Sequence, residues 1–128
     1  MGRIVTPVTI ANALHPSKEI LCEALVDTGT TGLVLPKAWK RRLGSLNLTR
    51  TVQMETADQR LVEGEIYGPV KIRIEGFDTI YNEVTFMEMR PGNGGYEPLL
   101  GYVILEQSRA AVDMLGHRLV EVKHFDLK

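Results

Sequence analysis

Residues 24–36 read ALVDTGTTGLVLP, and the rest of the chain is best interpreted around this stretch. The aliphatic residues at either end predict two strands, and the polar residues between them predict a tight loop. Asp27 stands at the end of the first strand, where burying a carboxylate is costly unless hydrogen bonds compensate it. Gly29 has no side chain, so the backbone can approach that carboxylate closely. The pattern indicates a functional aspartate, and an ordinary turn built from Asp, Thr and Gly is the alternative interpretation.

Strands are predicted on both sides of this loop. Residues 3–12, 19–26 and 33–35 carry the aliphatic patterns of extended segments, and residues 15–18 form a predicted turn. Pro7 lacks the N–H that a central strand donates, so it confines the first segment to an edge or a bulge. The N-terminal part of the chain is therefore expected to be extended apart from its turns.

The middle of the chain predicts one short helix followed by a sheet. Residues 37–43 lie between Pro36 and Gly44, an arrangement typical of a two-turn helix. Residues 46–89 alternate apolar and polar side chains over long stretches. This alternation predicts antiparallel strands with one face exposed to water.

The C-terminal part predicts a loop, a helix and a hairpin. Residues 91–95 form an irregular glycine-rich loop, and residues 102–109 form a short helix. The hairpin arms are residues 110–114 and 119–125, with the turn at residues 116–117. The predicted fold class is mostly β, with one or two short helices.

Composition limits the class of protein and its partners. A chain of 128 residues is expected to form a single domain spanning residues 1–128. Fifteen basic and sixteen acidic residues give a net charge of −1, and the basic cluster at residues 40–42 is too short to bind a polyanion. No apolar run approaches the ~20 residues of a membrane-spanning helix. Neither nucleic acid nor a membrane is therefore an expected partner.

Cysteine and histidine usage argues against metals and cofactors. Cys22 is the one cysteine of the chain, so an intrachain disulfide is impossible and a reducing, cytoplasmic location is expected. The N-terminus also lacks the pattern of a signal peptide. We expect Cys22 to act as a small buried hydrophobe rather than as a nucleophile. His15, His117 and His124 lack the spacing of a metal site, and no nucleotide-binding glycine motif is present, so no metal or cofactor is predicted.

Three segments together resemble one known family. Residues 24–36 closely resemble the active-site loop of aspartic proteases, in which aliphatic residues precede Asp-Thr-Gly. Leu99-Leu100-Gly101 and the helix after it resemble the second element of that family, and residues 51–64 stand where the family has a hairpin flap. The order and size are similar to those of the retroviral-type, or retropepsin-like, single-domain members. The resemblance covers nearly the whole chain and implies a small closed antiparallel β-barrel.

The resemblance also implies roles for the loop residues. Asp27 is the expected catalytic acid and base, and the Thr28 hydroxyl is expected to lock two such loops together. Gly29 is expected to let backbone N–H groups approach the carboxylates. Leu100 and Gly101 belong to the second element, and Gly101 is expected to pack beneath the loop.

Substrate contacts are implied for two further loops. Ala57, Asp58 and Gln59 at the flap tip are expected to close over an extended peptide and pair with its backbone. Residues 94–96 are expected to border the subsites for substrate side chains. The tip of this flap departs from the family, because it lacks the glycine-rich sequence of retroviral flaps.

Hydrolysis by this chemistry needs two carboxyl groups that share one proton, and aspartic proteases are the usual example of such a pair. The chain has one Asp-Thr-Gly, because none of its other aspartates precedes Thr-Gly. Asp27 of a second copy must therefore supply the other carboxyl group. The sequence predicts a two-fold homodimer acting on a polypeptide, held together by the active-site loops and by residues 3–8 and 119–125.

Two other interpretations compete with an active protease. The segment Asp27-x-Gly29-Thr30-Thr31 also resembles the phosphate loop of actin-like ATPases and sugar kinases, but those proteins are much longer and have two α/β lobes. A catalytically silent dimeric domain that binds peptides or acts as a scaffold would keep the fold and lose the activity. The intact Asp-Thr-Gly argues against it, since a costly carboxylate pair would then serve no purpose.

Thr30 predicts how activity depends on pH. A hydroxyl residue directly after Asp-Thr-Gly is similar to the arrangement in cellular pepsin-like enzymes, whereas many retroviral ones have alanine there. A hydroxyl that donates to the outer oxygen of Asp27 would favour the ionised carboxylate. We therefore predict an acidic, bell-shaped activity profile that Thr30 tunes, and the alternative is that Thr30 only caps the turn.

Overall fold

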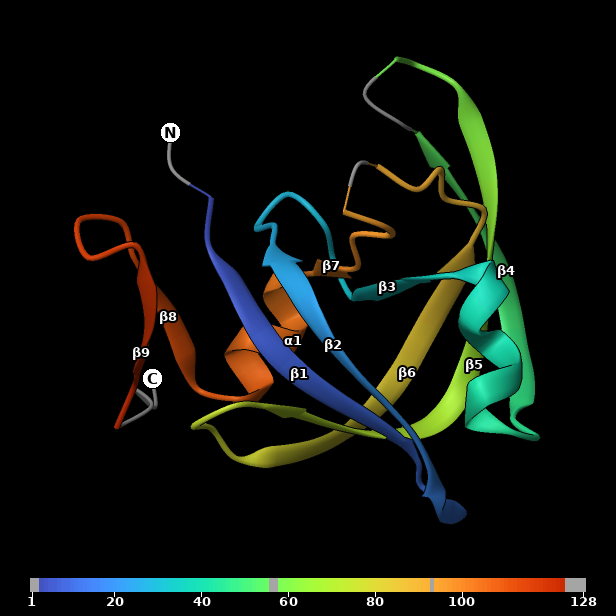
Figure 1. Ribbon diagram of the computed structural model, residues 1–128, viewed down its shortest axis with the longest axis horizontal. Coiled ribbons are helices and arrows are strands. Elements are labelled where there is room, and N and C mark those ends of the chain that lie inside the picture. The colour runs from blue at the N-terminus through green and yellow to red at the C-terminus, as the bar shows by residue number, and fades with distance from the viewer. Residues whose placement is uncertain (1–2, 56–57, 93, 124–128) are drawn as a thin grey trace, which may run out of the picture.

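The computed structural model of the chain describes residues 3–55, 58–92 and 94–123, and most of them lie in strands (Figure 1). In chain order the elements are β1 Val5–Asn12, β2 His15–Val26, β3 Leu33–Pro36, the 3-10 helix η1 Lys37–Leu43, β4 Asn47–Glu55, β5 Leu61–Ile74, β6 Thr79–Met87, β7 Leu99–Leu100, α1 Tyr102–Gln107, β8 Ala110–Asp113 and β9 Arg118–Glu121. The predicted mostly β class with short helices is confirmed. No helix among the described residues is long and apolar enough to cross a membrane.

The strands of the main sheet close into a barrel. They follow the order β1-β2-β7-β3-β6-β5-β4, and β5 also pairs with β1. That last pairing joins residues 8–12 of β1 to residues 70–74 of β5, so the order returns to its first strand. Strand β4 stays outside the closed ring and pairs with β5 alone among the described strands. The barrel predicted from the family resemblance is therefore present.

Two of its ladders run parallel, although antiparallel pairing is expected throughout. Strand β7 pairs parallel with β2, and β3 pairs parallel with β6. Parallel neighbours need a long connection between them, and the chain supplies one in each case. The alternation of side chains reports which residues face the core, but it carries no information about strand direction.

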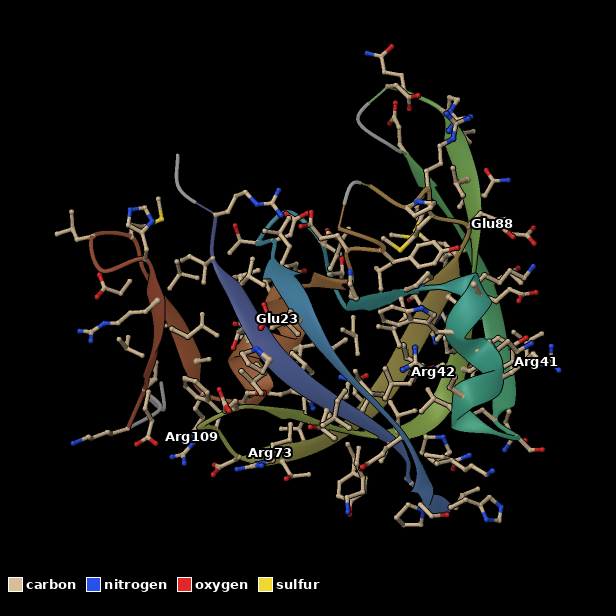
Figure 2. The ribbon with its side chains drawn as sticks, in the orientation of Figure 1. Glu23, Arg41, Arg42, Arg73, Glu88 and Arg109 are labelled. Atoms are coloured by element: carbon tan, nitrogen blue, oxygen red, sulfur yellow. The ribbon has the colours of Figure 1, made fainter. Side chains whose placement is uncertain are left out.

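The core is filled by aliphatic side chains together with Tyr67 and Phe86. On β5, Val70, Ile72 and Ile74 are fully buried, whereas Arg73 between them is exposed. Charged residues such as Glu23 and Arg73 lie on the outer surface (Figure 2). The prediction that one face of the sheet is exposed to solvent is therefore confirmed for β5.

The first turn lies two residues earlier than predicted. The turn expected at residues 15–18 is wrong, because those residues begin β2 and the chain reverses at Ala13-Leu14. Buried Asn12 causes this: its side-chain oxygen accepts hydrogen bonds from the amides of Leu14 at 2.9 Å and His15 at 3.3 Å. Its side-chain nitrogen donates to the backbone carbonyls of Leu43, the last residue of η1, and Ser45, at 2.8 Å each. The bonds to Leu14 and His15 are local, whereas the carbonyls that hold the Asn12 side chain lie 31 and 33 residues away and leave no local signal.

The predicted helices and C-terminal hairpin are present. Residues 37–43 form a helix of the 3-10 type, and Gly44 ends it at a φ of 70°, where glycine is favoured. Helix α1 is two residues shorter than expected, because it ends at Gln107. Strands β8 and β9 form the hairpin, and His117 in its turn has a φ of 51°.

Candidate active site

Asp27 directly follows β2 and begins the loop that leads to β3. Its backbone amide donates to the carbonyl of Leu100 at 3.0 Å. Leu100 belongs to β7, which lies between β2 and β3 in the sheet. The aspartate is therefore anchored where two strands far apart in the sequence meet, as Figure 1 shows near the label of β7.

The carboxylate of Asp27 is oriented by its own loop. The amide of Gly29 donates to Oδ1 at 3.0 Å, and the hydroxyl of Thr30 donates to Oδ2 at 2.9 Å. The amide of Thr30 also donates to the Asp27 carbonyl at 3.1 Å. Asp27 is half-buried, and Thr28 and Gly29 beside it are exposed. The loop therefore presents a fixed carboxylate at the surface, and the predicted donor role of Thr30 has the geometry it needs.

Gly101 lies beneath the loop. Its amide donates to the carbonyl of Gly32 at 2.9 Å. The amide of Tyr102 donates to the carbonyl of Thr30 at 2.9 Å, and the amide of Val103 donates to the carbonyl of Thr31 at 3.0 Å. A Cβ atom added at Gly101 would stand 2.5 Å from the Gly32 oxygen and closer still to the Thr30 oxygen. Only glycine fits this contact between α1 and the loop.

The flap is the β4–β5 hairpin, which projects beyond the barrel in Figure 1. Its last pair of residues is Glu55 and Leu61. Asp58 and Gln59 at the tip are exposed, and Gln59 has a φ of 64°. Ala57, the third predicted contact of the tip, lies outside the described residues. The predicted position of the flap is thus occupied by a hairpin, and the substrate contacts of its tip stay a prediction.

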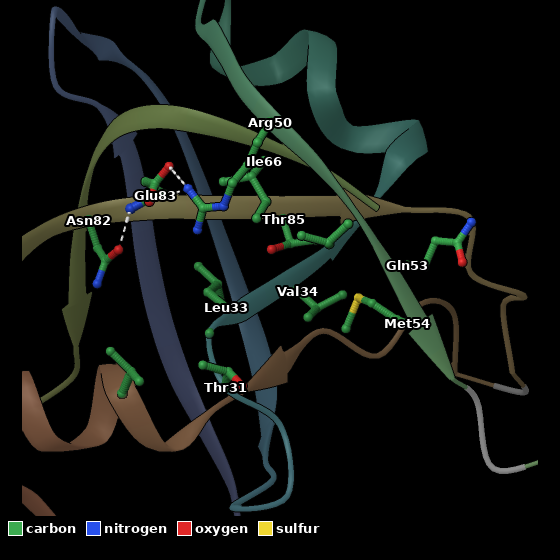
Figure 3. A pocket seen from close by; sticks show the side chains of 13 residues that line it. Thr31, Leu33, Val34, Arg50, Gln53, Met54, Ile66, Asn82, Glu83 and Thr85 are labelled. Atoms are coloured by element: carbon green, nitrogen blue, oxygen red, sulfur yellow. Dashed lines mark hydrogen bonds and ion pairs between the residues drawn. The ribbon is translucent and has the colours of Figure 1, made fainter. Parts of the chain in front are cut away.

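A pocket of about 500 Å³ lies between the flap and the loop after Asp27 (Figure 3). Its lining comes from the loop, from β3 to β6 and from α1, namely Thr31, Gly32, Leu33, Val34, Arg50, Val52, Gln53, Met54, Ile66, Asn82, Glu83, Thr85 and Val103. One side is aliphatic, and Arg50 contributes an ion pair with Glu83 at 3.1 Å. The pocket is large enough for an amino-acid side chain.

Sequence reasoning did not identify the residues of this pocket. Arg50, Val52 and Met54 line it from alternate positions of β4, and Gln53 of the same strand also lines it. The alternation along residues 46–89 could have shown this, but it does not tell which side faces a pocket. Glu83 comes from β6, and no local pattern links it to Arg50.

The loop before β7 forms part of a second pocket. Gly94, Gly95 and Tyr96 line it together with Arg3 and Leu99. Tyr96 also makes an edge-on ring contact with Trp39 of η1, with centroids 6.0 Å apart. This contact fixes one side of the loop, whose predicted role at the subsites remains a prediction.

In the described part of the chain, no group of three or more His, Cys, Asp or Glu side chains gathers. His15 and His117 are exposed at the start of β2 and in the β8–β9 turn. His124 lies outside the described residues.

We expect Cys22 to react slowly with thiol reagents. Burial raises the pKa of its thiol to about 11 from an ordinary 9.0, and the positive charge of Arg42 offsets part of this. Near pH 8, a pKa that is two units higher lowers the fraction of reactive thiolate about 100-fold. The rate of alkylation by iodoacetamide should therefore be about 100-fold lower for the folded protein than for the same protein unfolded in urea. Equal rates in the two states would contradict an unreactive Cys22.

Comparison with known proteins gives a match to a family and a match to a fold. A family model described as aspartyl protease matches residues 6–104, which include Asp27, the flap and Gly101. Among solved structures, the chain is similar to the EIAV protease complexed with the inhibitor HBY-793, at a TM-score of 0.58 and 24% identity. That match covers 83% of this chain and 88% of the viral one, and at this identity it shows the fold alone. A search of curated protein sequences finds no match.

Proposed function

Because the chain belongs to the aspartyl protease family and has a retropepsin-like fold, we propose that it is an endopeptidase that works as a homodimer. Each copy contributes Asp27 to one shared site. The substrate is a polypeptide in extended conformation.

The main observation in support of the proposal is that the carboxylate of Asp27 is held in a fixed orientation on an exposed loop. Hydrogen bonds from Gly29 and Thr30 occupy one position on each of its oxygens. A carboxylate oxygen accepts more than one bond, so both oxygens can still accept a proton or bind water. The loop holds this arrangement through backbone bonds to the segment at Gly101, so it is in place before any substrate arrives.

In the proposed dimer, one ionised and one protonated carboxyl group act on a water between them. The ionised Asp27 takes a proton from the water, and the water oxygen bonds to the scissile carbonyl carbon. The partner subunit's Asp27 gives its proton to the carbonyl oxygen. The tetrahedral intermediate then collapses: Asp27, now protonated, gives its proton to the amide nitrogen, a hydroxyl of the intermediate returns a proton to the partner subunit's Asp27, and the C–N bond breaks. Two carboxyl groups therefore exchange their roles, and each cycle returns them to one shared proton.

The flap and the pocket provide the substrate contacts of the proposal. Strand β4 pairs on one side with β5, and its other edge has no partner strand among the described residues. An extended peptide can lie under the flap hairpin, with a side chain in the pocket between Val34 and Met54. The aliphatic lining favours an apolar side chain at this position.

A mixed peptide library tests the proposal. The protein is incubated with the library at several pH values, and new N-termini are identified by mass spectrometry. Sedimentation in parallel should show a species of twice 14.3 kDa. Cleavage by a strictly monomeric protein would rule out the shared site, and binding of peptides without cleavage would favour a silent peptide-binding domain instead.

We expect Thr30→Ala to shift the pH dependence of cleavage. The Thr30 hydroxyl donates to Asp27 Oδ2 and so favours the ionised carboxylate. Without this donor, ionisation of the pair is less favourable, and the alkaline limb of kcat/KM moves to higher pH. The two carboxyls are coupled, so the shift belongs to the pair as a whole.

The control is Thr30→Ser, which keeps the hydroxyl and should retain the wild-type profile. Superimposable alkaline limbs for wild type and Thr30→Ala would show that Thr30 only stabilises the turn.

A further inference from the structure

The pocket between the flap and the loop after Asp27 has one polar end. Figure 3 shows Arg50 and Glu83 together at this end. Val34 and Met54 lie toward the other end of the pocket. A side chain that extends from one end to the other therefore needs an apolar part and a polar part.

Glu83 of β6 is held at the polar end by bonds from β4. Its Oε2 accepts from the hydroxyl of Thr49 at 2.7 Å. Nη1 of Arg50 donates to Oε1 at 3.2 Å and to Oε2 at 3.1 Å. Neighbouring residues of a regular strand point to opposite faces, but the register of β4 with β5 shifts between Leu48 and Arg50. Because of this bulge, Thr49 and Arg50 reach the same carboxylate and fix the geometry of the ion pair.

The ion pair keeps hydrogen-bonding positions for a ligand. Arg50 uses Nη1 for Glu83, and its Nε and Nη2 have no hydrogen-bond partner among the described residues. In the same part of the chain, Oε1 of Glu83 accepts from Arg50 alone, although a carboxylate oxygen can accept a second bond. Both side chains line the pocket and are partly exposed to solvent. The polar end thus offers donors and an acceptor side by side, and the pair adds no net charge.

A carboxamide group matches this combination. Its oxygen can accept from Arg50, and its N–H can donate to Glu83. A carboxylate would lie beside the negative charge of Glu83, and an ammonium group beside the positive charge of Arg50. An apolar group would displace water from both charges without replacing the hydrogen bonds of that water. Glutamine joins a carboxamide to a short aliphatic stem, so it suits both ends of the pocket.

We propose that Arg50 and Glu83 determine substrate specificity by selecting a glutamine side chain of the peptide in this pocket. The inference rests on the proposed function, because it needs an extended peptide bound under the flap. The preference of the aliphatic lining for apolar groups applies to the stem of this side chain, and the ion pair selects its terminal group. A site that hydrogen-bonds a polar group leaves its own charges unpaired when that group is missing, so the selection is strong.

Peptide pools with one fixed residue test the proposal. Each pool has glutamine, glutamate, lysine or methionine at one position and mixed residues at all others. At one position, the wild type should cleave the glutamine pool at least about tenfold faster than the other three pools. Fluorescence anisotropy of the labelled pools with the Asp27→Asn variant measures the same preference as binding, without cleavage.

Two substitutions should change the preferred pool in opposite directions. Glu83→Gln leaves the positive charge of Arg50 without its partner, so the glutamate pool should become the best substrate. Arg50→Met leaves the negative charge of Glu83 without its partner, so the lysine pool should become the best substrate. Both side chains are partly exposed, so both variants should keep the circular dichroism of the wild type. If the pair only stabilised the flap, all pools would lose cleavage equally and their order would stay the same.

Asp78→Asn and Arg109→Met are the matched controls. Asp78 and Arg109 form an ion pair at 2.7 Å, and neither residue lines the pocket. Both variants should therefore keep the wild-type order of the four pools.

The outcomes separate this inference from the proposed function. If the wild type cleaves peptides but favours glutamine at no position, the specificity role is overturned and the protease proposal stands. The same conclusion follows if Glu83→Gln and Arg50→Met keep the wild-type order of the pools. If Asp27→Asn binds the glutamine pool best but the wild type cleaves no pool, the specificity role holds and the proposed hydrolysis fails. If no pool is cleaved or bound, both proposals are overturned.

Discussion

Asp27→Asn is expected to abolish peptide cleavage, with a loss of at least about 10³-fold in kcat/KM. The amide has nearly the same shape as the carboxylate and can still accept a hydrogen bond from Gly29. It cannot take a proton from water, so the base of the proposed pair is lost. Circular dichroism and thermal unfolding should stay close to wild type. The measurement is kcat/KM on a peptide selected from the library.

The same variant should also inhibit the wild type. In a mixed dimer one copy carries asparagine, so the site has a single carboxyl group and the dimer is inactive. Cleavage should therefore fall with the square of the wild-type fraction as Asp27→Asn is added at constant total protein. A linear fall would indicate that each copy acts alone.

Asp78→Asn is the matched control. Asp78 is exposed and pairs with Arg109, away from the loop of Asp27. This variant should cleave at the wild-type rate and should not inhibit. If Asp27→Asn folds normally and cleaves like Asp78→Asn, Asp27 is not the catalytic residue and the proposed function is wrong.

Gly101→Ala is expected to cost about 3 kcal/mol or more in the free energy of unfolding. The added Cβ would stand 2.5 Å from the Gly32 oxygen, and all its near neighbours are backbone atoms of the active-site loop. Backbone cannot move aside as a flexible side chain can. The loop or α1 must therefore shift, which breaks the bonds from Gly101, Tyr102 and Val103 to the loop. Urea unfolding measures the loss, and remaining folded protein should cleave poorly.

Gly32→Ala provides the comparison for this effect. Gly32 lies in the same loop, and a Cβ atom there meets nothing within 4 Å. Its substitution should change the free energy of unfolding by less than about 1 kcal/mol. If the two variants unfold at the same urea concentration, the close contact beneath the loop does not stabilise the fold.

The loop that orients Asp27 could be predicted because its signal is local. Asp27, Gly29 and Thr30 lie within four residues, and the hydrogen bonds that orient the carboxylate stay inside this segment. The residue types themselves therefore limit what the segment can do. The same holds for Gly44, which ends η1 at a positive φ, and for the turn of the β8–β9 hairpin.

The flap and the barrel could be predicted in part. Alternation along residues 46–89 identified strands and their buried faces, because side chains in a strand point to opposite sides in turn. The parallel pairing of β2 with β7 and of β3 with β6 could not be predicted in this way. Strand direction depends on how the whole barrel closes, and that closure joins β1 to β5 across about 60 residues of sequence.

By itself, the sequence determined the chemistry available to this protein: one Asp-Thr-Gly loop, a glycine after two leucines, and alternating strands that can bury one face. Only the tertiary structure decided where these features meet. It placed Gly101 against the carbonyls beyond Asp27, Arg50 beside Glu83 in the pocket, and Asn12 against the end of η1. Each of these contacts joins residues more than 30 positions apart. Their geometry follows from the packing of the whole barrel, because a hydrogen bond or a close contact depends on distances that no local pattern contains.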